Sequence, residues 1–301
     1  MAKLVASRVV RKWQESIDAE DDGKVVVANR DLLCYSIDII SLVVFATDVD
    51  SLRTGEMGVC YTIQNILKRS MVRIFAPFPY WKIPLVGQYL DGCGMYIQRA
   101  KRNIRRIIDE HESSLKEADA HNHNDKDNHN KRNRKSFLGK LLALAEKEDV
   151  PLSEDRVIGN LLTMFAAGSE TTYNTILVCL YELALDKTKG GWLQDEISEE
   201  VSAMLANASS SNNSSSYEPD DKNYDADAAA FAAIDLGRLN QGLPRTRSLL
   251  YEVLRLKGPS PLMNGESLTE VNINGVVIPA RTQFLQLTRY ASRVKTQWSV
   301  R

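Results

Sequence analysis

Apolar residues recur at helical spacing through the first half of the chain. Residues 30–46 are predicted to form a largely apolar helix, residues 57–72 a second helix, and residues 94–117 a charged amphipathic helix. Between the second and third of these, the stretch APFPYWKIPL contains three prolines and is not expected to form a regular helix. The pattern indicates a protein made mainly of packed helices.

The longest helical pattern begins after Ser153, a favourable N-cap residue that precedes two acidic residues. Apolar residues then recur at Val157, Ile158, Leu161, Leu162, Phe165, Ile176, Leu177 and Leu180. A helix over residues 154–185 would be about 50 Å long. Because apolar residues lie nearly all round it, we expect it to be the longest and most central helix, buried most deeply at its centre.

Two polar tracts interrupt the helical pattern. Residues 118–135 and 207–230 contain almost no large apolar side chains, and we expect them to be disordered insertions into one domain that covers residues 1–301. His121, His123 and His129 lie in the first tract. A metal site there is an alternative, but no ordered Cys or His framework fixes a coordination geometry.

The pattern changes near the end of the chain. The stretch LPRTRSLLYEVLRLK is predicted to be a helix that ends at Gly258 and Pro259. In VNINGVVI, Asn274–Gly275 separates two apolar runs, which favours a β-hairpin, and residues 282–287 are a further candidate strand. The predicted fold class is therefore mainly α, with a small β-hairpin or sheet late in the chain.

Charge and cysteine content narrow the possible functions. The 38 basic residues nearly balance the 39 acidic residues, so no overall field recruits nucleic acid, and none is expected as a partner. The four cysteines form no C-x-x-C pair, which favours reduced thiols. No apolar run reaches membrane-spanning length, and the first residues lack the apolar block of a signal peptide, so no anchor or signal is expected and the localisation stays open.

The long predicted helix contains an unusual stretch, AGSETT, at Ala167 to Thr172. A glycine, a carboxylate and two hydroxyls within one and a half turns are not what packing alone would select. Taken by itself, the stretch is also compatible with a core helix whose hydroxyls bond to its own backbone. A second short pattern, E-x-x-R, falls at Glu252 and Arg255 on the later helix.

Together with the following INGVVIPART, these two motifs resemble the cytochrome P-450 family of haem-thiolate monooxygenases. The resemblance covers nearly the whole chain outside the polar tracts. It implies a haem cofactor, an apolar small-molecule substrate and an electron-donating reductase. Members of the family are often bound to membranes of the endoplasmic reticulum or of organelles.

The resemblance also implies roles for individual residues. Ala167 and Gly168 would lie at the distal haem face, where the missing side chain of Gly168 permits a close backbone approach. Glu170 and Thr171 would be the catalytic acid–alcohol pair that guides protons. Thr171 would also bond to the carbonyl of Ala167 and open the helix locally, beside a concave apolar surface. Glu252 and Arg255 would form a buried structural ion pair.

One departure from the family pattern concerns the axial ligand. The family's ligand is a cysteine in a glycine-rich loop well after E-x-x-R, but no cysteine follows Cys179 in these 301 residues. Cys93, in DGCGMY, precedes both motifs, and this order excludes it as the family's ligand. We therefore expect an interior piece of such an enzyme, without a metal ligand and without normal monooxygenase activity by itself.

Two other functions are compatible with the sequence. The chain could be a non-catalytic helical interaction module, which a cooperative haem-free fold would support. A metal-binding protein built on residues 121–130 is the weakest hypothesis, because it depends on the histidine tract alone.

Overall fold

The computed structural model describes residues 2–18, 27–54, 59–74, 76–84, 87, 90–120, 136–147, 153–211, 237 and 241–293. The chain divides into two compact units, Met1–Tyr173 and Asn174–Arg301, and each is considered by itself. The expectation of a single domain stays a prediction. Across the described part of the chain, every helix is too short or too polar to span a lipid bilayer.

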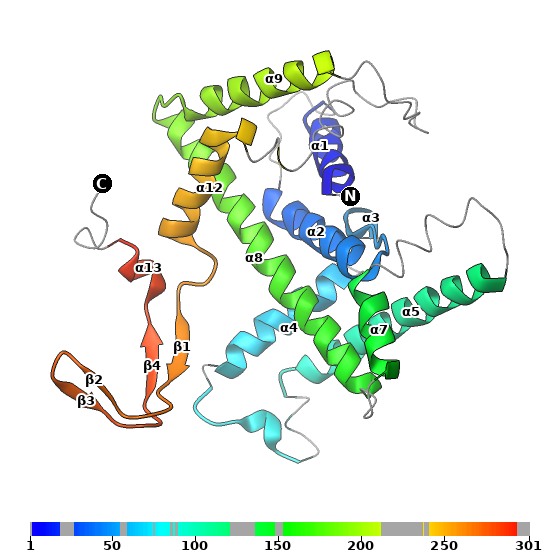
Figure 1. The fold of residues 1–301 in the computed structure, drawn as a ribbon, viewed down its shortest axis with the longest axis vertical. Helices are drawn as coiled ribbons and strands as arrows, with labels where there is room; N and C mark the ends of the chain where they lie inside the picture. Colours follow the sequence, from blue (N-terminus) through cyan, green and yellow to red (C-terminus); the bar gives the residue numbers. More distant parts are fainter. Residues whose placement is uncertain are drawn as a thin grey trace. The chain divides into compact units, whose positions relative to one another are not determined.

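The first unit is built from helices (Figure 1). In chain order they are α1 (Ala2–Asp18), α2 (Ala28–Ile40), the π-helix η1 (Ser41–Phe45), α3 (Ser51–Thr54), α4 (Val59–Ile74), the 3₁₀ turn η3 (Tyr80–Lys82), α5 (Cys93–Ala120), α7 (Phe137–Lys147) and the first part of α8 (Glu154–Thr188). The proline-rich stretch forms only the short η3 turn, as its prolines predict. The mainly helical architecture expected from the sequence is confirmed.

A continuous apolar core fills the first unit. It takes side chains from α2, η1, α4, α5, α7 and α8, and among the most deeply buried are Leu33, Ile37, Phe45, Leu138, Ile158, Leu161 and Phe165. The rings of Phe45 and Phe165 stack with centroids 4.7 Å apart. This stack joins the π-helix to α8 inside the core.

The carboxylate of Asp91 stabilises the connection between α4 and α5. Arg73 donates from Nε and Nη2 to the two carboxylate oxygens at 2.6 and 2.9 Å, and the Tyr80 hydroxyl donates to Oδ2 at 2.9 Å. The backbone N–H of Cys93 donates to Oδ1 at 2.9 Å, which caps the start of α5. One carboxylate therefore fixes the end of α4, the η3 turn and the start of α5.

In its described residues, the second unit combines the rest of α8 with three helices and four short strands. These are α9 (Leu193–Ser211), α12 (Pro244–Lys257), α13 (Thr288–Ala291), β1 (Met263–Glu266), β2 (Val271–Ile273), β3 (Val276–Ile278) and β4 (Gln283–Gln286). Strand β1 pairs antiparallel with β4, and β2 with β3. The β2–β3 hairpin lies beyond the end of the β1–β4 ladder (Figure 1). Asn274 and Gly275 both have positive φ, so the predicted hairpin turn is confirmed.

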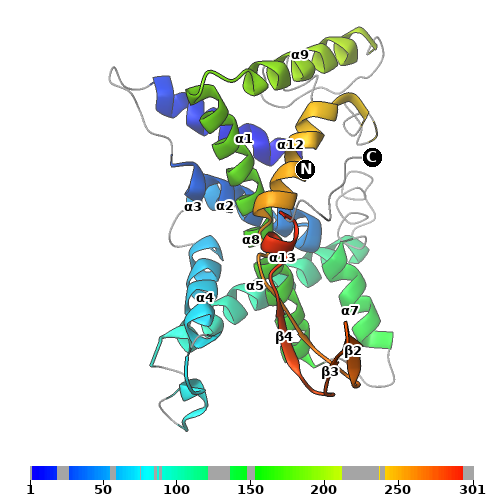
Figure 2. The same ribbon diagram turned by 90° about the vertical axis from the view of Figure 1, so that its left-hand side faces the viewer.

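The α12 helix is anchored at both ends within this unit. Leu243, at its N-cap, supplies no side-chain hydrogen bond, but the Glu200 carboxylate of α9 accepts from the N–H groups of Arg245 (2.7 Å) and Thr246 (3.1 Å). At its other end, Ser292 Oγ donates to the carbonyl of Arg255 at 2.5 Å. Figure 2 shows α13 directly beside this end of α12.

Several helix boundaries differ from those predicted from the sequence. Helix α5 continues to Ala120 and α9 to Ser211, so helix replaces the first residues of both predicted disordered tracts. Good helix formers such as Lys116, Glu117 and Ala118 explain the extension of α5. The remainder of the tracts, residues 121–135 and 212–230, lies outside the described residues. Helices α7 and α9 were not identified from the sequence, although the leucines of LLALAEK and the acidic first turn of α9 were usable signals.

The α8 helix is the longest that the structure describes, as predicted, with 35 residues. Ser153 stands just before it, and its carbonyl accepts from the N–H of Val157. The prediction that its centre is the most buried part is wrong. Full burial ends at Ser169, because the core of the first unit covers only the earlier turns.

Candidate functional site

The AGSETT stretch lies on α8 directly after its most deeply buried turns. Ile158, Leu161, Phe165 and Ser169 form a fully buried stripe at helical spacing and face the core. Ala167 and Thr171, four residues apart, are exposed and share another face of the helix. Ala167 and Thr171 therefore lie on the open face of the helix, whereas Gly168 faces Ile40 of α2.

Hydroxyl groups bond back to the helix throughout this stretch. Thr171 Oγ1 donates to the carbonyl of Ala167 at 2.8 Å, which is the bond expected from the sequence. Thr172 Oγ1 donates to the carbonyl of Gly168 at 2.7 Å, and Ser169 Oγ to that of Phe165 at 2.6 Å. The expected local opening of the helix is not seen, because α8 is regular α-helix from residue 154 to 188.

Glu170 is half-buried and stands one residue before Thr171. The structure therefore brings all four predicted residues, Ala167, Gly168, Glu170 and Thr171, onto one and a half turns of one helix. Their assigned roles in binding and catalysis stay predictions.

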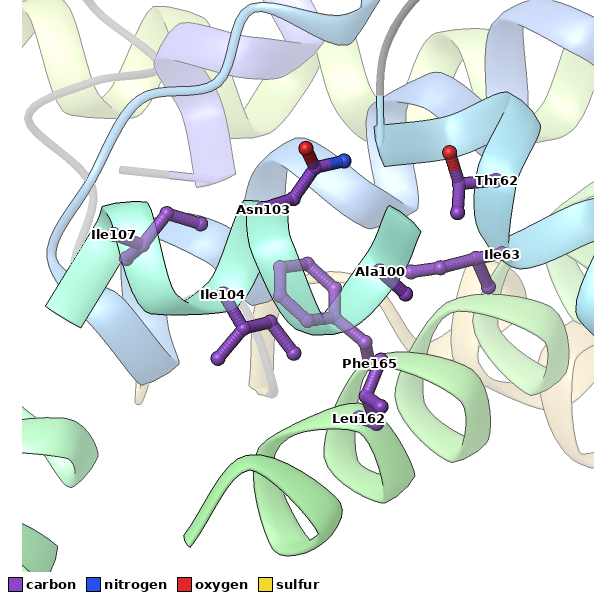
Figure 3. A pocket seen from close by; sticks show the side chains of 8 residues that line it. All are labelled: Thr62, Ile63, Ala100, Asn103, Ile104, Ile107, Leu162 and Phe165. Carbon is purple, nitrogen blue, oxygen red and sulfur yellow. The ribbon is translucent and has the colours of Figure 1, made fainter. Parts of the chain in front are cut away.

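A small cavity lies on the core side of α8 (Figure 3). Its volume is about 10 Å³, and it is lined by Thr62, Ile63, Ala100, Asn103, Ile104, Ile107, Leu162 and Phe165. A space of this size holds one water molecule at most. Because Ala167, Gly168 and Thr171 do not line it, it is not the apolar concavity that we expected beside them.

Glu252 and Arg255 form the predicted ion pair on α12 in the second unit. Arg255 donates from Nε to Glu252 Oε2 at 2.8 Å and from Nη2 to Oε1. The guanidinium holds the pKa of Glu252 below its ordinary value. The expectation of a buried pair is wrong, since the side chains are 29% and 54% exposed for Arg255 and Glu252. The reason is that Val253 is the one residue of α12 that is buried.

The pair has a third partner that the sequence did not reveal. Arg255 Nη1 donates to the backbone carbonyl of Ser292 at 2.8 Å, and the Ser292 hydroxyl donates back to the carbonyl of Arg255. No sequence motif marks Ser292, because its role depends on how α13 returns to α12. Arg255 therefore links its own helix to the segment after β4.

Two sets of described residues bear on whether a haem group fits here, the open face of α8 and the cysteines. Ala167 and Thr171 have small, exposed side chains, so no bulky group at these two positions covers α8. The cysteines that the structure describes offer no exposed sulfur as an axial ligand, since Cys34 and Cys93 are buried and Cys179 is half-buried. Within the described residues, no three His, Cys, Asp or Glu side chains are placed to hold a metal ion.

Comparison with known proteins bears on this geometry. The chain is 25% identical over 290 residues to cytochrome P-450 monooxygenase 205 from Postia placenta, which covers 94% of this chain and 47% of that protein. It is 29% identical over 136 residues to cytochrome P-450 71D94 from Mentha gracilis, covering 45% of this chain and 22% of that protein. The matched region thus spans less than half the length of these relatives.

The fold also has a counterpart among solved structures. The haem domain of a cytochrome P-450DA mutant matches 99% of this chain and 54% of its own, with a TM-score of 0.67 at 18% identity. That likeness shows the fold alone. The family model for cytochrome P-450 matches residues 1–300, and the chain therefore belongs to the cytochrome P-450 family.

Proposed function

We propose that these residues supply the oxygen-side wall and the proton-delivering groups of a haem monooxygenase that hydroxylates an apolar organic substrate. Haem is the cofactor of the family and supplies the oxygen-activating chemistry when it is bound. The observation that carries the proposal is the pairing of Ala167 and Thr171 on the open face of α8, with Thr171 Oγ1 bonded to the Ala167 carbonyl. The electron donor would be a reductase.

Each residue of the stretch has one task in this proposal. Ala167, whose small side chain is exposed, lets the helix backbone lie close to the cofactor, and Gly168 follows it on the side of α8 that faces Ile40. Thr171 holds a proton at Oγ1, which it can turn from the Ala167 carbonyl toward a bound ligand. Glu170, adjacent and half-buried, resupplies that proton from solvent. Glu252 and Arg255 act structurally, by fixing α12 to the segment around Ser292.

The first test concerns the axial ligand. Purified protein of residues 1–301, mixed with haem, reduced and exposed to carbon monoxide, should not give the red-shifted band that thiolate ligation produces. The reason is that no cysteine follows Arg255 in this sequence, while Cys34 and Cys93 are buried. A thiolate-type band would contradict the proposal and point to one of the four cysteines.

The second test concerns proton delivery in a chain extended through a cysteine-containing loop that ligates haem. There, Thr171→Ala should lower product formed per electron consumed, because the hydroxyl that delivers the proton is lost. Thr163→Ala is the matched control, since Thr163 Oγ1 makes the same backbone bond to Gly159 at 2.9 Å two turns earlier. Equal coupling efficiency in the two variants would overturn the role of Thr171.

A further inference from the structure

Gly168 faces a side chain from another helix at unusually short range. A Cβ placed on Gly168 would lie 2.6 Å from Cδ1 of Ile40 and 3.2 Å from its Cγ1. Carbon atoms in van der Waals contact are separated by about 3.5–4.0 Å, so the space that a side chain would need is already filled. Ile40 thus occupies the hollow that the absence of a side chain leaves in α8.

Ile40 is the last residue of α2, and the π-helix η1 follows it directly. In η1 the backbone bonds span five residues, and the N–H of Ala46 donates to the carbonyl of Ser41. Ile40, just before η1, and Phe45, its last residue, both reach α8. Phe45 stacks on Phe165, and Ile40 fills the space at Gly168, three residues further along α8. Two neighbouring points of α8 are therefore held by one segment.

We infer that Ile40 is a positioning residue for the AGSETT stretch. By filling the hollow at Gly168, it sets how closely α8 approaches α2 and how its next turn is rotated. Glu170 and Thr171 lie on that next turn. The functional meaning of this inference rests on the proposed role of Thr171, whereas the packing relation between Ile40 and Gly168 does not.

The inference gives Gly168 a reason to be glycine even when no cofactor is bound. Glycine in the middle of a helix is destabilising relative to alanine, so the position sacrifices helix stability. If Ile40 is what requires the glycine, alanine should be harmful at position 168 only while Ile40 is present. The structure provides a control in Gly159, also on α8, where an added Cβ would meet nothing within 4 Å.

The experiment measures thermal unfolding of the 301-residue chain in six forms. These are the natural sequence, Gly168→Ala, Ile40→Ala, their double variant, Gly159→Ala, and Gly159→Ala combined with Ile40→Ala. Gly168→Ala should lower Tm by about 2–4 °C in the natural sequence and raise it in the Ile40→Ala background. Gly159→Ala should raise Tm in both backgrounds, because only helix propensity changes.

Two results would overturn the packing relation. Gly168→Ala could raise Tm in the natural sequence, as at Gly159, or it could lower Tm equally in both backgrounds. Should Ile40→Ala fail to fold, Ile40→Val removes only Cδ1, the atom nearest to the added Cβ, and should still relieve most of the penalty. A full penalty in that background would count against the inference.

The positioning role itself is tested by amide hydrogen exchange, which needs no cofactor. In Ile40→Ala, the amides of residues 168–172 should exchange several-fold faster relative to those of residues 157–161. Uniform acceleration along α8 would show that Ile40 merely adds to the core. Because none of these measurements uses haem, they can fail while the proposed function stands, and the reverse also holds.

Discussion

The two units of the chain differ in what holds them together. The first has a shared apolar core to which α2, η1, α4, α5, α7 and α8 contribute. In the described part of the second, Val253 is the one apolar residue that is buried, and the strands expose residues such as Val276, Phe284 and Leu285. Hydrophobic burial therefore organises the first unit, while the described part of the second gains little from it.

Polar contacts carry the organisation of the second unit. Glu200 caps α12, Lys257 bonds to Glu182 and lies over the ring of Tyr181, and Arg255 bonds to Ser292. Exposed contacts of this kind contribute little each, so the unit should respond to salt and pH more than the first. Apolar burial therefore holds the first unit together, whereas hydrogen bonds and ion pairs hold the described part of the second.

The largest expected effect compares two phenylalanines, one in each unit. Phe165→Ala removes a fully buried ring and its stack on Phe45, and should lower the free energy of unfolding by about 3–5 kcal/mol. Phe284→Ala is the matched change in the second unit, where the ring is 53% exposed and rests on Gly265, and should cost less than about 1 kcal/mol. Chemical denaturation of both variants would test the comparison, and equal losses would contradict it.

A smaller effect is expected from the carboxylate that anchors the first unit. Asp91→Asn should cost about 2 kcal/mol, because Arg73 loses its charged partner at a site where both side chains are largely shielded. Asp109→Asn, at an exposed position on α5, is the control and should change little.

Acid should reproduce the Asp91 effect. The hydrogen bonds from Arg73 hold the pKa of Asp91 well below its usual value, despite an opposing contribution from burial. Its stabilising contribution is therefore full above the unfolded pKa, near 3.9, and decreases as pH falls below that value. In Asp91→Asn this part of the pH dependence of unfolding should disappear.

The smallest effect concerns the carboxylate that caps α12. Burial raises the pKa of Glu200, but the hydrogen bonds from Arg245 and Thr246 outweigh it, and the net pKa lies below the ordinary value. Glu200→Gln should cost about 1 kcal/mol at neutral pH, and the difference from the natural chain should shrink as the carboxylate is protonated in acid. Glu199→Gln, exposed on the same helix, should leave unfolding unchanged, and an equal loss there would refute the capping role.

Features with local causes were predictable from the sequence. The Asn274–Gly275 turn and the start of α8 after Ser153 follow from backbone preferences of one or two residues. The stretch AGSETT lies on the long helix predicted from the sequence. Thr171 Oγ1 bonds to the carbonyl of Ala167, as the four-residue spacing predicted. Such features can be predicted from the residues next to them in the chain.

Features that depend on distant segments were not predictable. Burial along α8 stops at Ser169 because of what the other helices cover, and the exposure of Glu252 depends on the packing of α12. Neither the π-helix after Ile40 nor the fit of Ile40 at Gly168 has a sequence signature, since SLVVF simply continues the apolar run of the helix before it. The same holds for Glu200, which caps a helix more than 40 residues away.

The β2–β3 turn has a chemical consequence beyond its shape. An asparagine followed by glycine is prone to spontaneous deamidation: the glycine nitrogen attacks the side-chain carbonyl carbon, ammonia leaves, and water opens the cyclic imide to give a carboxylate. In this turn the N–H of Gly275 is already committed to Asn272 Oδ1 at 2.9 Å, and this bond restrains the attacking nitrogen. Deamidation of Asn274, detected as a small gain in mass, should therefore accelerate whenever the hairpin opens. Its extent would then report how long the two strands spend unpaired.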